Sequence, residues 1–178
     1  ASQLRDQLPA LAERGGRLVI CGGGLTGIEA ATEFAETYPG LQVTLLTRDV
    51  FGAQLSLKGR AYVRQTFERL GIEIRDKTTI RAFTADAIHY DGGSLAYDAC
   101  LWAGSFTVPT LARESGLKVN AVGQIITDDH LRSVTDSHIY AIGDAADVSA
   151  AIGTPIRMAC ATALPMGMHV ANELADRL

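Results

Sequence analysis

Three glycines with the spacing G-x-G-x-x-G are the residues most suited to chemistry: Gly22, Gly24 and Gly27. The first allows a tight turn, the second lets a ligand approach the backbone, and the third lets a helix pack closely on a strand. The pattern alone is weak in a chain with 18 glycines. Its context is more specific, because an apolar strand-like run at residues 18–21 precedes it and a helix-like run at residues 25–37 follows it.

The start of that helix is where a phosphate would be held. Its unpaired amide groups and the positive end of its dipole would face the glycine turn. We therefore predict that residues 22–27, with Leu25 and Thr26 among them, bind the pyrophosphate of NADH or NADPH. The alternative is a strand-to-helix turn that binds no ligand.

The end of the next predicted strand bears on which nucleotide binds. An acidic residue about 20 residues beyond the glycines would bond the 2′-hydroxyl of the adenosine ribose. This sequence has Thr47 and Arg48 there, followed by Asp49. Arg48 is suited to pairing with a 2′-phosphate, which favours NADPH. An alternative stays open, in which Arg48 is a solvated turn residue and Asp49 bonds the ribose 2′-hydroxyl of NADH.

Other residues able to do chemistry give weaker signals. Glu29 falls in the first turn of the predicted helix, where the dipole favours a carboxylate, so a structural role stands beside a supporting catalytic one. Cys21 and Cys100 lie in apolar runs and are predicted to be buried, inert thiols. No metal site is predicted, because the four histidines match neither a metal-ligand spacing nor a catalytic triad. They are His89, His130, His138 and His169.

The elements that position the glycine turn alternate between strand and helix. After a leading helix at residues 4–13, interrupted by Pro9, apolar strands are predicted at residues 18–21, 43–47 and 72–75, with helices at 25–37 and 57–70 between them. This order predicts an α/β fold: a Rossmann-like parallel sheet with right-handed crossovers and helices on both faces.

Beyond residue 78 the pattern changes. Short strand-like runs at residues 79–83, 87–90 and 95–97, with turn residues at 91–93, predict an antiparallel β-meander. A further apolar strand is expected at residues 99–103. A loop region through residue 122, a strand pair at 124–127 and 137–142, and a helix at 156–174, kinked at Pro165, complete the expectation.

Composition excludes several classes of function. The net charge of −4 and the lack of a basic run argue against nucleic acid as a partner. No apolar run approaches the roughly 20 residues that span a bilayer, and the first residues lack the layout of a signal peptide. With three well-separated cysteines and no C-x-x-C pair, a reducing, cytoplasmic setting is the expectation.

Three later segments make a resemblance plain. They are residues 98–104 (DACLWAG), residues 123–127 with the Leu-Arg-Ser that follows at 131–133, and residues 139–146 (IYAIGDAA). Together with the glycine turn, Glu29 and the meander, they resemble the pyridine-nucleotide half of the two-dinucleotide-binding-domain flavoproteins, the FAD-dependent pyridine nucleotide-disulfide oxidoreductase family. The Leu-Trp-Ala-Gly and Leu-Arg-Ser blocks most resemble its type II NADH dehydrogenase-like members.

The resemblance implies a second cofactor, FAD, and roles for further residues. Asp144 would contact the flavin nucleotide, and Gly143 would allow its close approach. Ala103 and Gly104 would lie at the passage from the NAD(P)H domain to the FAD domain, and Glu29 would lie near the nicotinamide. The implied organisation is a leading helix (1–16), an NAD(P)H-binding Rossmann domain (17–104) and the C-terminal portion of a split FAD domain (105–178).

Family members also have an FAD-binding glycine loop upstream and a dimerisation or membrane-docking domain downstream. The chain is therefore expected to be a fragment that is inactive alone, and homodimerisation and peripheral membrane association stay open. The implied function is hydride transfer from NAD(P)H to FAD and on to a quinone, disulfide or protein acceptor. The alternatives are a non-catalytic NAD(P)H-sensing or interaction module, and a self-contained Rossmann dehydrogenase, which the Gly143-Asp144 block disfavours.

Overall fold

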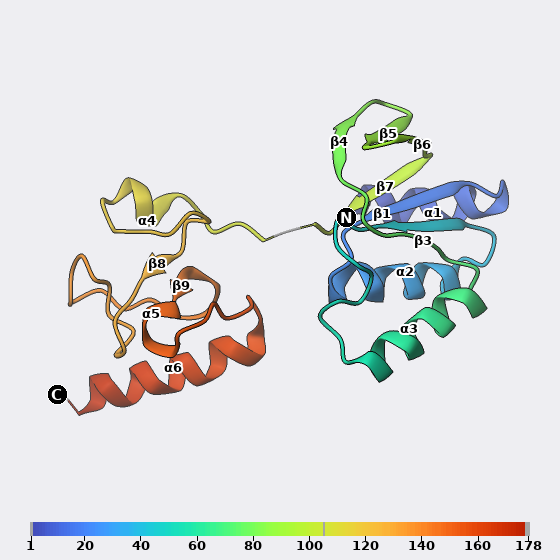
Figure 1. Cartoon of the computed structure of the whole chain (residues 1–178). Helices are drawn as coiled ribbons and strands as arrows, with labels where there is room; N and C mark the ends of the chain where they lie inside the picture. Colours follow the sequence, from blue (N-terminus) through green and yellow to red (C-terminus); the bar gives the residue numbers. More distant parts are fainter. Residues whose placement is uncertain (1, 105, 177–178) are drawn as a thin grey trace. The chain divides into compact units, whose positions relative to one another are not determined.

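The computed structural model describes residues 2–104 and 106–176, and divides the chain into two compact units, Ala1–Ser105 and Phe106–Leu178 (Figure 1). Three of the predicted domain limits fall on residues 1, 105 and 178, which lie outside the described residues.

The first unit is built on a four-stranded parallel sheet in the order β3-β2-β1-β7. Its strands are β1 (Arg17–Cys21), β2 (Gln42–Leu46), β3 (Glu73–Arg75) and β7 (Ala99–Trp102), and its helices are α1 (Ser2–Glu13), α2 (Leu25–Thr37) and α3 (Leu57–Arg69). The predicted parallel α/β fold is confirmed. Pro9 lies inside α1 without ending it, so the predicted interruption is wrong.

Side chains alternate between the two faces of this sheet. Leu18 and Ile20 of β1 belong to a core that also holds buried residues of α1, α2 and α3. Val19 and Cys21, pointing the other way, pack with Ile88 in a separate core. Figure 1 shows α2 and α3 on one side of the sheet and the meander on the other.

The predicted placement of helices on both faces is therefore corrected in one respect. The second face is covered by an antiparallel sheet of β4 (Ile80–Phe83), β5 (Ala87–Tyr90) and β6 (Gly93–Ala96). Residues 79–97 consist of short strand-like runs joined by tight turns. The connection from β3 to β7 therefore lacks the spacing of apolar residues that a helix would need.

The second unit has less regular structure. It contains α4 (Leu111–Glu114), β8 (Ile125–Ile126), the 3₁₀ turn η1 (Gly143–Ala145), β9 (Ala146–Asp147), α5 (Ser149–Ile152) and α6 (Cys160–Ala175). Its core joins Leu131, Ala141 and Val148 to Met166 and Val170 of α6.

Two predictions for this unit are corrected. β8 pairs in parallel with β9 and not with residues 137–142, which form only a single bridge between Arg132 and Tyr140. The carboxylate of Asp136 accepts a bond from the amide of His138, and the Asp136 carbonyl accepts one from Ile139. This local turn competes with an extended strand. The last helix begins at Cys160 and not near residue 156, and it contains Pro165.

Candidate functional site

The glycine turn joins β1 to α2, and at Gly22 and Gly27 only glycine fits. Gly22 has a φ of +135°, which disfavours any side chain, and its amide donates to the Leu46 carbonyl at 2.8 Å. A Cβ at Gly22 would collide with the backbone of Ala103, and one at Gly27 would collide with the carbonyl of Gly22. The turn, the start of α2 and the end of β7 are thus packed backbone against backbone.

Gly24 differs from its neighbours, because nothing lies within 4 Å of the place where its Cβ would be. It is the N-cap of α2, with an extended backbone (φ −71°, ψ 175°) and no side-chain capping bond. Leu25 and Thr26, the first residues of the helix, are exposed. The first amide groups of a helix have no partner within it. An open, uncapped helix start next to a glycine fits a bound pyrophosphate.

The end of β2 lies beside this turn. The buried side chain of Thr47 packs against Gly23, where an added Cβ would collide with it. Arg48 is exposed, and its guanidinium lies 3.5 Å from the carboxylate of Asp49. The structure thus places Thr47 against the glycine turn, whereas Arg48, the next residue, is exposed and contacts only Asp49 among its described ion-pair partners.

Gln54 is a contact of the turn that the sequence analysis missed. Its Nε2 donates to the carbonyl of Gly23 at 3.1 Å. Residues 47–56 carry no helix or strand period, so no sequence signal placed Gln54 against the glycines.

Glu29 is exposed on α2, but it is the fifth residue of the helix and not part of its first turn. The dipole argument for this carboxylate is corrected, because the effect falls off within one turn.

The end of β7 completes this edge of the sheet. The Ala103 amide donates to the Cys21 carbonyl at 2.8 Å. A Cβ at Gly104 would lie 2.8 Å from the indole of Trp102, which is exposed and meets Phe83 edge-on at a ring distance of 5.8 Å.

Cys21 and Cys100 lie side by side beneath the glycine turn, with their Sγ atoms 3.6 Å apart. The hydrogen bond with Cys100, together with burial, raises the pKa of the Cys21 thiol. Since the thiolate is the reactive form, this agrees with an inert thiol at Cys21. Cys100 is only partly buried, so the prediction of two buried thiols holds for Cys21 alone. The contact between the two cysteines was not expected, because 79 residues separate them.

In the second unit, Gly143 and Asp144 form the 3₁₀ turn η1. Gly143 has a φ of +63°, and its amide lies 3.1 Å from the sulfur of Met166 on α6. Gln124 fixes the other side of the turn by donating to the carbonyls of Asp144 and Ala146. The carboxylate of Asp144 belongs to an exposed residue on a turn held from two sides.

Asp147 anchors the strand after this turn. It accepts bonds from the hydroxyl and amide of Ser149 and from the side chain of Asn120. The hydroxyl of Ser149 is the main cause that lowers the pKa of Asp147. Asp147 is thus committed to holding the loop, whereas Asp144 is available to a ligand.

A model of the family described as pyridine nucleotide-disulphide oxidoreductase matches residues 2–172. The chain belongs to this family. The match extends through both units and agrees with the resemblance carried by the sequence motifs.

Similar proteins include NADH dehydrogenase-like members. The chain is 25% identical over 132 residues to the NADH dehydrogenase-like protein YutJ of Bacillus subtilis, covering 74% of this chain and 37% of that protein. It is 31% identical over 147 residues to the type II NADH:quinone oxidoreductase of Haemophilus influenzae, covering 72% and 33%. The chain therefore spans about a third of the length of these relatives.

Solved structures show the same fold. The water-forming NADH oxidase from Lactobacillus brevis bound to NADH superimposes with a TM-score of 0.73 at 24% identity, over 93% of this chain and 39% of that one. The NAD-dependent persulfide reductase from A. fulgidus gives 0.75 at 21%, over 98% and 34%. Within residues 2–104 and 106–176, no helix is both long and apolar enough to cross a membrane.

Proposed function

We propose that this chain is the NAD(P)H-binding part of an FAD-dependent oxidoreductase, with the dinucleotide pyrophosphate held at residues 22–27. The bound cofactors supply the chemistry, which is hydride transfer from NAD(P)H to FAD followed by reduction of a quinone, disulfide or protein acceptor. The observation that carries the proposal is the open space at Gly24, in front of an uncapped helix start and between glycines that admit no side chain.

The chain's own residues bind and orient the nucleotide in this proposal. The amides at the start of α2 bond the phosphates, and Gly22 and Gly27 keep the turn close to the sheet. Gln54 supports the turn through its bond to Gly23. Glu29, exposed one turn further along α2, is proposed as a supporting residue near the nicotinamide.

NADPH is the proposed nucleotide. No acidic side chain occupies the first two positions after β2, and the exposed Arg48 guanidinium is free to leave the 3.5 Å contact with Asp49 for a 2′-phosphate.

Gly143 and Asp144 are proposed to contact FAD together with chain outside residues 1–178. An exposed carboxylate on a firmly held turn is suited to bonding hydroxyl groups of a nucleotide. A cytoplasmic setting belongs to the same proposal. The electron acceptor and a homodimer also remain proposals.

The test uses a longer protein that contains this chain. It should purify yellow, and NADPH should bleach its flavin absorbance under anaerobic conditions. A colourless protein that cannot be loaded with FAD would contradict the oxidoreductase and favour an NAD(P)H-sensing module.

A further inference from the structure

Two histidines and a glutamate from distant parts of the sequence meet in the second unit. His169 and Glu173 are four residues apart on α6, so they share one face of the helix. His130 comes from the turn at residues 128–132. Their ligand-type atoms all lie within 4.8 Å of one another.

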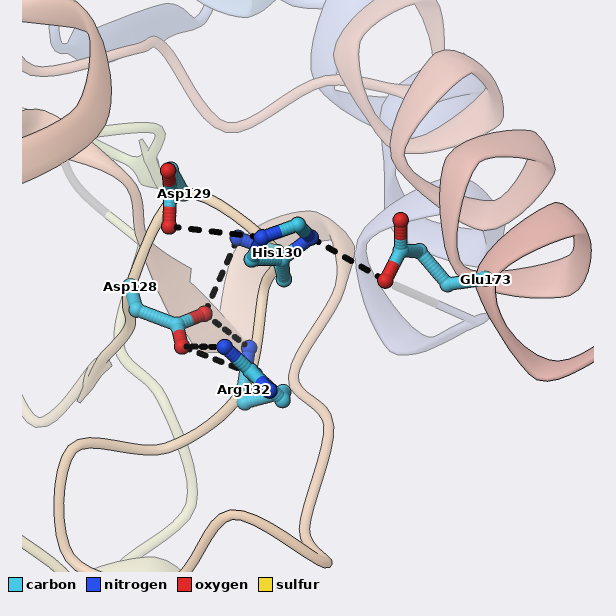
Figure 2. Close-up of polar contacts among 5 residues, drawn as sticks. All are labelled: Asp128, Asp129, His130, Arg132 and Glu173. Carbon is cyan, nitrogen blue, oxygen red and sulfur yellow. Dashed lines mark hydrogen bonds and ion pairs between the residues drawn. The ribbon is translucent and has the colours of Figure 1, made fainter. Parts of the chain in front are cut away.

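His130 is turned toward this face of α6. Its Nδ1 lies 3.0 Å from a carboxylate oxygen of Glu173, a contact that Figure 2 shows. The atom is buried, yet the contact lacks the geometry of a hydrogen bond. The imidazoles of His130 and His169 lie nearly parallel, with centroids 6.5 Å apart and planes 22° apart.

The turn that carries His130 is held firmly. Asp128 accepts bonds from the amides of His130 and Arg132, each at 2.9 Å, and from the Arg132 side chain at 2.8 Å (Figure 2). Leu131 has a left-handed backbone, with a φ of +62°, and its side chain is buried in the core. The imidazole is therefore presented by a pre-formed turn, and the only cation of that turn, Arg132, is already paired with Asp128.

We propose that His130, His169 and Glu173 bind a divalent transition-metal ion of the zinc, cobalt, nickel or copper class. Two imidazole nitrogens and one carboxylate oxygen are a donor set that suits these ions, whereas magnesium and calcium prefer oxygen alone. Ligand bonds of about 2.0–2.2 Å require the donor atoms to lie about 3.4 Å apart around a tetrahedral ion. Small side-chain rotations reach this from the present separations.

The surroundings complete the site. Asp129 places a carboxylate oxygen 3.9 Å from Nε2 of His130, the ring nitrogen that faces away from Glu173. This distance is too long for a hydrogen bond, but a small rotation of Asp129 would let it accept the Nε2–H bond through which a carboxylate orients a ligating histidine and raises its basicity. The ion would tie the turn at residues 128–132 to the C-terminal half of α6 and leave a coordination position open to water.

The test is a calorimetric titration of the whole chain with Zn²⁺, after a chelator has removed any bound metal. We expect one ion per chain. The variants His169→Ala and Glu173→Gln should each weaken Zn²⁺ binding by about 100-fold or more. This exceeds the 10–100-fold loss in metal affinity that is typical when a residue that only supports a ligand is replaced. Both side chains lie outside the hydrophobic core, so the variants should fold.

His138→Ala is the matched control, since His138 is an exposed histidine of the same unit whose imidazole pairs with Asp136. It should bind Zn²⁺ as the unaltered chain does. Co²⁺ gives a second readout, because its visible ligand-field bands should appear in the unaltered chain and His138→Ala and vanish in His169→Ala. Absence of one-to-one binding, or unaltered affinity in either ligand variant, would overturn the proposal.

Discussion

The three glycines of the G-x-G-x-x-G motif have different structural roles. Gly22 and Gly27 have no room for a side chain because backbone atoms occupy the space. Gly24 has room for a Cβ and an extended backbone that alanine also adopts. Packing in the first unit therefore does not require glycine at this position, and in the proposed function the space in front of Gly24 is filled by the nucleotide.

Gly24→Ala should consequently fold and fail to bind. We expect a loss of stability within about 1 kcal/mol, as for an N-cap change, and a loss of NADPH affinity of about tenfold or more, equivalent to about 1.4 kcal/mol. Urea unfolding and calorimetry measure the two effects. Gly167→Ala is the matched control: this α6 glycine also has room for a Cβ, so its replacement should stabilise by about 0.5–1 kcal/mol and leave NADPH binding unchanged. Wild-type affinity in Gly24→Ala would place the nucleotide elsewhere.

Arg48 governs the choice of nucleotide in this account. Arg48→Ala should weaken NADPH binding by about tenfold or more through loss of a charge-assisted pair with the 2′-phosphate, and leave NADH binding unchanged. Arg5→Ala is the matched control for Arg48→Ala, because Arg5 is an exposed arginine that also pairs with the next residue, Asp6. Equal losses for NADH and NADPH in Arg48→Ala would remove Arg48 from this role.

At the scale of elements, the starts of β1 and β7 are joined by one carboxylate. Asp98 accepts the Arg17 amide at 2.8 Å and its side chain at 3.2 Å, with Arg14 at 3.8 Å. The bond from the Arg17 amide is the first cause that lowers the pKa of Asp98 below its usual value of 3.8. A lowered folded-state pKa adds stability above the unfolded value, and this stability is lost as the pH falls through the folded value.

Asp98→Asn should therefore be less stable at pH 7 by about 1 kcal/mol, the scale of one hydrogen bond to a charged group after solvent screening. The difference should shrink as the pH falls below 3.8, where the wild-type carboxylate becomes protonated. Urea midpoints measured across this range report it. A difference that stays constant with pH would show that the charge is not involved.

The first unit was predictable because its signals are local. The bounds predicted for α2, residues 25–37, match the helix, because the glycine turn precedes apolar residues at helical spacing and the Tyr38-Pro39-Gly40 stop follows them. The strand at residues 137–142 was wrong because Asp136 closes a turn that apolar content does not reveal. The position of Gln54 and the meeting of His130 with α6 depend on tertiary packing. The i, i+4 pair His169 and Glu173 was the one local signal for that group.

At the scale of the whole molecule, the chain divides into two compact units, with the glycine turn in one and the Gly143-Asp144 turn in the other. Several apolar side chains of the second unit are exposed, and they are Ile142, Ile152, Leu164 and Met168. We expect chain outside residues 1–178 to cover them and to complete the FAD site.

The isolated chain should accordingly bind NADPH weakly and retain no FAD. Purified with added FAD and passed over a desalting column, it should emerge without flavin absorbance and show no NADPH oxidation. Stoichiometric flavin on the isolated chain would show that the second unit alone builds the FAD site.

The central claim is that residues 22–27 hold the nucleotide pyrophosphate, and an amide NMR titration of this chain with NADPH tests it residue by residue. We predict saturable shifts of the amide signals that are concentrated in residues 22–28 and extend to Thr47, Arg48 and Gly104. In the variant Gly24→Ala, these shifts should be smaller than in the unaltered chain at every NADPH concentration. Saturable shifts confined to other segments, or none at all up to millimolar NADPH, would contradict it.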